Sequence, residues 1–104
     1  MKRKRRGGPI RDPFETLDGT VTATLDLHGF TASQARDAAV AFLQHESRHR
    51  PGSLVHLVTG KGRGSAGGPV LLPRIRSLLR TGEVACIASW GADLDGGGFL
   101  IRLR

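Results

Sequence analysis

The segment 21–28 alternates strictly between apolar and polar residues. In an extended chain, successive side chains point to opposite faces, so such a segment predicts a strand with one buried and one open face. Its buried side carries Val21, Ala23, Leu25 and Leu27, and its open side carries Thr22, Thr24, Asp26 and His28. Thr31 is then a predicted helix N-cap, and Gln34 completes a capping box. We therefore expect a helix that runs to about His49.

The remaining segments complete a β-α-β-α-β-β order. Residues 53–59 are largely apolar on both faces, which is typical of a central strand. A glycine-rich loop over 60–68 precedes a helix at about 70–80, and strands at 83–90 and 99–104 form a hairpin. A right-handed crossover makes the first two strands parallel neighbours. We predict a two-layer α/β (α+β) sandwich, with a four-stranded mixed sheet and two helices on one face.

The positive charge of the chain is concentrated at its beginning. The net charge is +7, and five of the sixteen Lys and Arg residues lie within the first six positions. These residues are Lys2, Arg3, Lys4, Arg5 and Arg6. We expect residues 1–19 to form a flexible basic arm and residues 20–104 to form one domain. Such an arm predicts a polyanionic partner such as RNA, DNA or the ribosome, although a solvated tail that aids solubility is the alternative.

The lone cysteine and the hydropathy pattern bear on the compartment. Cys86 lies within an apolar run and has no second cysteine to pair with, which favours a buried structural thiol in a reducing environment. No segment approaches the ~20 apolar residues of a membrane span, and no apolar stretch follows the charged start. We therefore expect a cytoplasmic protein without a membrane partner.

Two polar turns follow the two strands that we expect to be parallel neighbours. His28 and Gly29 end the first strand, and Thr59 and Gly60 end the second. Sites in open α/β sheets form beyond the carboxyl ends of such strands, so we expect these turns to converge. His28 is a candidate general acid or base. The alternative is that the polar residues of these turns only hydrogen-bond neighbouring loops and hold them in place.

The second turn has the composition of a phosphate-binding loop. Glycines permit close approach of backbone amides to an anion, and cationic side chains add charge. The expected nucleic-acid-binding residues of this loop are Thr59, Gly60, Lys61, Gly62, Arg63 and Gly64. Asp26, on the same face as His28 and roughly 7 Å from it along the strand, could orient a neighbouring group or hold a cation. A glycine loop without a ligand is the alternative.

Other histidines and the tryptophan are weaker candidates. His45 and His49 match the HExxH pattern of zinc proteases, but they fall on the last turns of a helix just before Pro51. A helix end is their expected role, and no metal site is predicted. We interpret His56 as a hydrogen-bonded residue of a sheet face. Trp90 is expected to pack at a strand end, with stacking on a base as the alternative.

Together, the segments 25–29 (LDLHG) and 59–62 (TGKG) resemble the small MutS-related (Smr) domain. The basic segment 63–71 and the glycines 96–98 add to the resemblance, which covers roughly residues 21–104. It implies a β-α-β-α-β-β sandwich similar to the C-terminal domain of translation initiation factor three. It also implies nucleic-acid binding and, in several members, an endonuclease that nicks DNA or cleaves RNA, including messenger RNA on stalled ribosomes.

The family's second motif begins with His or Thr, and here Thr59 leaves His28 as the sole obvious proton-transfer group. We therefore predict an endonuclease with His28, Asp26 and Lys61 as catalytic residues. The sequence has no dense acidic cluster of the kind that a two-metal mechanism uses, and attack by a ribose 2′-hydroxyl would need no metal. A divalent cation remains an open option as cofactor. The alternative is a non-catalytic module that binds RNA, DNA or the ribosome.

Overall fold

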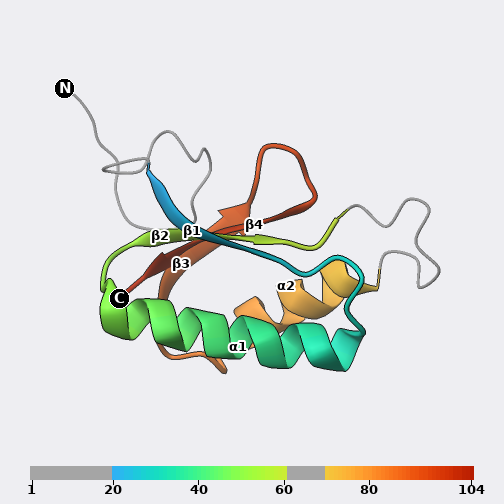
Figure 1. The fold of residues 1–104 in the computed structure, drawn as a ribbon, viewed down its shortest axis with the longest axis horizontal. Helices are drawn as coiled ribbons and strands as arrows, with labels where there is room; N and C mark the ends of the chain where they lie inside the picture. The colour runs from blue at the N-terminus through green and yellow to red at the C-terminus, as the bar shows by residue number, and fades with distance from the viewer. Residues whose placement is uncertain (1–19, 61–69) are drawn as a thin grey trace.

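The structure is a computed structural model that describes residues 20–60 and 70–104. Its elements follow the predicted β-α-β-α-β-β order (Figure 1). They are β1 (Val21–Asp26), α1 (Ala32–His49), β2 (Leu54–Val58), α2 (Leu71–Thr81), β3 (Ile87–Ala92) and β4 (Gly98–Leu103). The expected basic arm, residues 1–19, and most of the glycine-rich loop lie outside the described residues.

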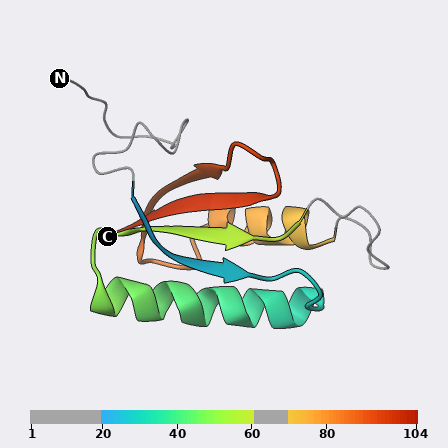
Figure 2. The same ribbon diagram turned by 45° about the horizontal axis from the view of Figure 1, so that its top comes forward.

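The four strands form one mixed sheet in the order β1-β2-β4-β3. β1 pairs with β2 in parallel, whereas β4 runs antiparallel to both β2 and β3. Both helices pack against the same face of this sheet (Figures 1 and 2). The predicted fold class is confirmed. Because Asp26 pairs with Val58, β1 and β2 end side by side at the same end of the sheet.

The core lies between the sheet and the two helices. From Thr22 to Asp26 the side chains of β1 alternate between exposed and partly buried positions, as predicted, but Val21, expected on the buried side, is exposed because it lies at the start of the edge strand. The sheet buries Val55, Leu57, Phe99, Ile101 and Leu103, the turn after β1 buries Leu27, and the helices bury Ala35, Ala39, Leu43, Ile75, Leu78 and Leu79. Trp90 packs its ring edge-on against Phe99 at a centroid distance of 5.8 Å, so it packs as expected, but it lies within β3 rather than at a strand end.

The second half of the chain differs in detail from the prediction. The sequence predicts the third strand at 83–90, but this strand begins at Ile87, because the chain first turns at Val84, whose carbonyl accepts the Ile87 N–H at 3.4 Å. Val84 nevertheless enters the core from this turn, so its apolar character does not mark a strand. Within residues 20–60 and 70–104, neither helix is long and apolar enough to cross a membrane.

The predicted capping box starts α1. The Gln34 N–H donates to Thr31 Oγ1 at 3.1 Å, and the Thr31 N–H donates to Gln34 Oε1 at 3.0 Å. Each bond satisfies a backbone donor that has no partner inside the helix. The box also fixes the point at which the chain leaves the turn that carries His28.

Replacing Thr31 with Ala should lower the free energy of unfolding by about 1 kcal/mol, because an N-cap acceptor is removed. The matched control is Ser33→Ala, an exposed first-turn residue, which should stay within about 0.5 kcal/mol of the wild type. Urea denaturation of the three proteins measures both values. Equal losses in the two variants would contradict a stabilising cap.

Candidate functional site

The turn after β1 presents His28 to solvent. The Phe30 N–H donates to the Leu27 carbonyl at 3.1 Å, and Gly29 adopts φ +87°, a backbone conformation that residues other than glycine rarely adopt. Leu27 is fully buried and donates its N–H to the Val58 carbonyl at 2.7 Å, which anchors the turn to β2. His28 therefore projects from a turn that is fixed on both sides.

Asp26 and His28 hydrogen-bond to each other. Asp26 Oδ1 lies 2.8 Å from His28 Nδ1 and accepts the His28 backbone N–H at 3.1 Å. The chain turns after Asp26 rather than continuing as a strand to residue 28, which brings the ring much closer than an extended chain would. The pair is open to solvent, with 76% of the His28 side chain and 52% of the Asp26 side chain exposed.

The hydrogen bond determines how the imidazole is presented. The side-chain bond from His28, followed by the backbone bond, holds the pKa of the Asp26 carboxyl below its ordinary value. An ionised carboxylate can only accept hydrogen bonds, so Nδ1 carries the proton in this pair. In the neutral ring, Nε2 is then the nitrogen that can accept a proton from a substrate.

The second turn lies against the first. Gly60 adopts φ +82°, and a β-carbon built on it would lie 3.9 Å from the β-carbon of His28. The structure thus brings together His28, Asp26, Thr59 and Gly60, as the parallel arrangement of the two strands predicts. Lys61, Gly62, Arg63 and Gly64 lie outside the described residues, as do Lys2, Arg3, Lys4, Arg5 and Arg6, and their roles stay predictions.

A single carbonyl in the β3–β4 loop holds the second turn. The Gly97 oxygen accepts the backbone N–H groups of Thr59 and Gly60, each at 2.9 Å, and the Thr59 hydroxyl at 3.1 Å. The amides of Thr59 and Gly60 are therefore already hydrogen-bonded within the protein. Any amides that bind a phosphate, as the glycine loop predicts, would have to follow Gly60 in the chain.

The sequence predicts the β3–β4 loop only as a hairpin connection. Its contribution comes from a backbone oxygen, which leaves no side-chain signature. The run of three glycines at 96–98 is the one signal in the sequence: a β-carbon on Gly98 would overlap the Leu57 carbonyl oxygen, so this close approach requires glycine. The loop is therefore a third structural component of the site.

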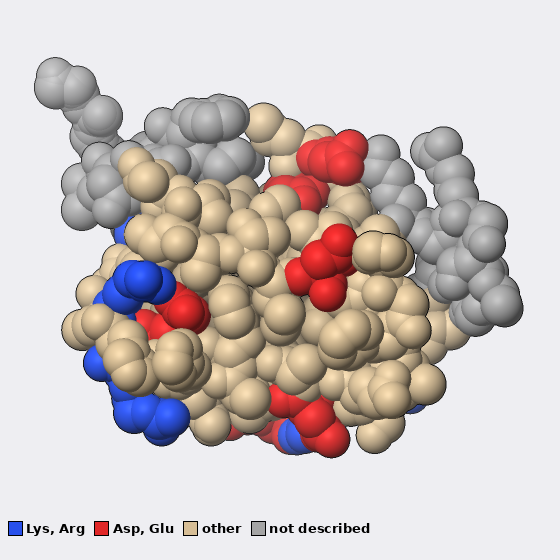
Figure 3. Space-filling model, in the orientation of Figure 1, with Lys and Arg blue, Asp and Glu red and all other residues tan. Residues whose placement is uncertain are grey.

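On the face of the molecule seen in Figure 3, positive charge lies at the end opposite His28. In this view the described arginine side chains are concentrated near the C-terminus and the end of α1 (Figure 3). Arg50, Arg102 and Arg104 meet around the α1–β2 turn, where Arg102 donates to the Gly52 carbonyl at 2.8 Å and the Gly52 N–H donates to the Arg104 carbonyl at 3.2 Å. The cations expected beside His28 are instead Lys61 and Arg63.

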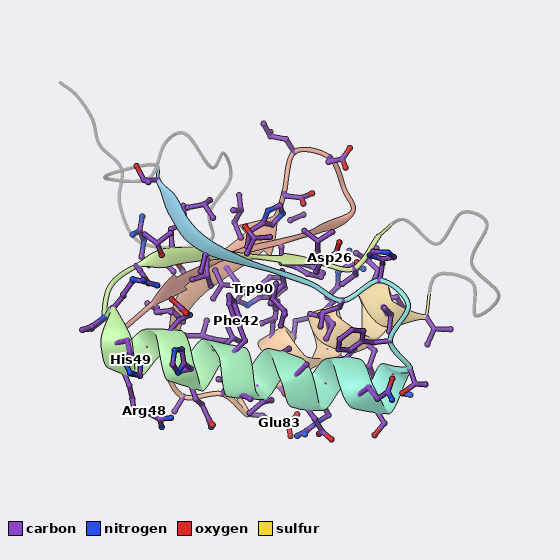
Figure 4. All side chains as sticks on the ribbon, viewed as in Figure 1. Asp26, Phe42, Arg48, His49, Glu83 and Trp90 are labelled. Carbon is purple, nitrogen blue, oxygen red and sulfur yellow. The ribbon has the colours of Figure 1, made fainter. Side chains whose placement is uncertain are left out.

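The HExxH segment forms the end of α1. The rings of His45 and His49 stand 4.1 Å apart, and His49 Nδ1 lies 2.8 Å from the His45 carbonyl oxygen. Figure 4 shows His49 and Arg48 at the end of α1, away from Asp26. Across residues 20–60 and 70–104, no group of three or more His, Cys, Asp or Glu side chains is placed to hold a metal ion.

Comparisons with known proteins agree with this arrangement. The family model described as the Smr domain matches residues 25–101. The structure is similar to the Smr domain of Thermus thermophilus MutS2, with a TM-score of 0.65 and 24% identity, over 80% of this chain and 99% of that domain. At that identity the likeness shows the fold alone.

A relative in Treponema pallidum (strain Nichols), described as an uncharacterized protein, is 46% identical over 58 residues. The match covers 56% of this chain but only 28% of the relative, so the chain is much shorter than that protein.

The lowered pKa of Asp26 should depend on His28. In the His28→Ala variant the side-chain hydrogen bond is removed, so the pKa of Asp26 should rise toward its ordinary value, as measured by carboxyl-detected NMR titration. His45→Ala is the control and should leave the pKa of Asp26 unchanged. An equally low pKa in His28→Ala would contradict the assignment of the shift to the pair.

The same shift predicts the direction of a stability effect. The folded-state pKa is lower than the unfolded-state value, so the contribution of the pair is complete above the ordinary carboxyl pKa. It is lost as the pH falls through the lowered value. In urea denaturation, wild type and His28→Ala should therefore differ more at neutral pH than in acid. The exposed pair makes this difference small, and a larger difference in acid would have the wrong sign.

Proposed function

The chain belongs to the Smr domain family, and we propose that it binds nucleic acid and cleaves phosphodiester bonds at the His28 turn. The observation that carries the proposal is the Asp26–His28 pair, which leaves Nε2 as the free ring nitrogen of a residue whose β-carbon lies beside Gly60. RNA is the favoured substrate, because a ribose 2′-hydroxyl supplies the nucleophile. Nicking of DNA is the other outcome of the tests below. With RNA or the ribosome as partner, the protein would act in the cytoplasm.

The proposed reaction is an internal transfer at phosphorus. His28 Nε2 accepts the proton of the 2′-hydroxyl as this oxygen attacks the adjacent phosphorus. The bond from phosphorus to the 5′-oxygen breaks, and this oxygen takes a proton from the imidazolium. The products are a 2′,3′-cyclic phosphate and a 5′-hydroxyl. Water is not consumed in this step.

The other residues would support the charges of this reaction. Asp26 stays ionised, so it keeps Nδ1 protonated and stabilises the imidazolium that forms. Lys61, proposed as catalytic, and Arg63 would stabilise the negative charge on the five-coordinate phosphorus. Asp26 also offers a carboxylate to a divalent cation, but the reaction as written needs none.

A non-catalytic module that binds RNA, DNA or the ribosome is the second candidate. It is favoured by the state of Thr59, whose hydroxyl donates toward the carbonyls of Gly97 and Gly60 in a buried position. This hydroxyl is therefore occupied and does not replace the histidine with which the motif begins in some family members. His28 would have to act as both base and acid.

Cleavage should depend on His28 alone among the exposed histidines. Replacing His28 with Ala should slow cleavage of single-stranded RNA by about 10²- to 10⁴-fold, because a general acid-base group is removed. Binding of the same RNA should be largely intact. The control His45→Ala should cleave at the wild-type rate, and EDTA should not stop the reaction. Unchanged cleavage by His28→Ala would remove His28 from the mechanism, and absence of cleavage by wild type would favour the binding module.

The basic arm should contribute to binding through charge. Replacing the five cationic residues at positions 2–6 with Ser should reduce the slope of log K against log salt. For single-stranded RNA, the slope should fall by about 0.7 for each phosphate that the arm neutralises in the wild type. Filter binding at several salt concentrations measures the slope. An unchanged slope would show that the arm does not contact the nucleic acid.

A further inference from the structure

We infer that His56 is a positioning residue: through Asp93 and the β3–β4 loop it sets the place of the Thr59–Gly60 turn beside His28. Its effect on cleavage rests on the proposed function, whereas its effect on the turn does not. His56 lies on the sheet face opposite the helices, because its neighbours Val55 and Leu57 both point into the core. His56 lies in β2, three residues before Thr59.

The first link joins β2 to the β3–β4 loop. His56 Nε2 and Asp93 Oδ2 are 2.7 Å apart, although the two residues are 37 positions apart in the chain. The Asp93 side chain is 9% exposed and that of His56 is 27% exposed, so the bond is shielded from water. A shielded hydrogen bond between an imidazole and a carboxyl group constrains both side chains more than an exposed one does.

The second link runs through the loop itself. The other carboxylate oxygen, Asp93 Oδ1, accepts the Gly96 N–H at 2.7 Å, and the Asp93 N–H donates to the Gly98 carbonyl at 3.1 Å. Asp93 therefore fixes the loop at both ends. Gly96 adopts φ +82°, a left-handed conformation that reverses the chain just before Gly97.

The third link reaches the site. The Gly97 carbonyl accepts three hydrogen bonds from Thr59 and Gly60, and Gly60 lies against His28. A continuous path thus connects His56 with His28 through one side-chain pair, one loop and one carbonyl. If the His56–Asp93 bond is removed, the loop loses its side-chain tie to β2, and the Gly97 carbonyl is held only by the backbone pairing of β2 with β4 and by its own bonds to Thr59 and Gly60.

The composition of the pair supports a positioning role over simple stabilisation. His56 is flanked in the sheet by Thr24 of β1 and Leu100 of β4. Apolar side chains at a partly buried pair of this kind often stabilise a fold as well as polar ones do. A polar pair also has a defined hydrogen-bonding geometry, so a carboxylate with fixed partners holds its loop in one arrangement. The competing explanation is that the His56 imidazole itself takes part in the chemistry.

Two substitutions separate these explanations. His56→Gln keeps an N–H donor that can reach Asp93, whereas His56→Leu keeps an apolar side chain without a donor. We expect the amide hydrogens of Thr59 and Gly60 to exchange at least about tenfold faster in His56→Leu, since a hydrogen bond to a charged group is removed. His56→Gln should exchange at close to the wild-type rate, as should the control His45→Leu. The Leu57 amide should be unaffected in all variants.

Cleavage kinetics give the second measurement. His56→Leu should lower kcat with little change in KM, and His56→Gln should restore kcat with the wild-type pH profile. Unchanged exchange of Thr59 and Gly60 in His56→Leu would overturn the inference. So would a His56→Gln variant as impaired as His56→Leu, because the imidazole itself would then be required.

If His56→Leu does not fold, Asp93→Ala, which removes both carboxylate bonds, tests the same path from the other side and should also speed the exchange of Thr59 and Gly60; unchanged exchange would overturn the inference. If wild type does not cleave RNA or DNA, the proposed function fails. The exchange measurement still decides the role of His56, so the two failures are distinguishable.

Discussion

The parallel pairing of β1 and β2 is the constraint on which the site depends. Because Asp26 pairs with Val58, both strands end at the same end of the sheet, and the two polar turns that follow them become neighbours. β4 fits against the other side of β2, and the absence of a side chain at Gly98 permits its close approach to Leu57. This packing places the Gly97 carbonyl where it can hold the Thr59–Gly60 turn. Three segments far apart in the sequence thus form one small region.

Within this region the division of tasks follows from hydrogen-bonding capacity. The amides of Thr59 and Gly60 donate to the Gly97 carbonyl, so the backbone of this turn forms a fixed wall of the site and has no free amide at these two residues. His28 is exposed and oriented by Asp26, so it provides a titratable group in a defined direction. Positive charge near His28 is expected from the segment after Gly60, since the described arginines around the α1–β2 turn lie at the opposite end of β1.

Much of the fold is predictable because its signals are local. The Thr31–Gln34 capping box and the alternation of β1 are each contained within a few residues; the box is confirmed, and the alternation is confirmed from Thr22 onward. The start of β3 is not predictable, because Val84 is buried from a turn and looks like a strand residue in the sequence. That β1 and β2 end side by side is predictable from their parallel topology. The role of Gly97 is not predictable, because it acts through a backbone oxygen that every residue has. The His56–Asp93 bond joins residues from different halves of the chain, and no pattern within either half indicates it.

The proposed chemistry depends on one step, in which His28, oriented by Asp26, transfers the proton that allows a phosphodiester bond to break. The chemical identity of the product ends tests this step most directly, on a single-stranded RNA incubated with the whole chain in EDTA. We expect fragments with a 2′,3′-cyclic phosphate and a 5′-hydroxyl, which His28→Ala should form at least about 10²-fold more slowly than wild type. Fragments with 5′-phosphate ends, or the same fragments at the same rate from His28→Ala, would contradict it.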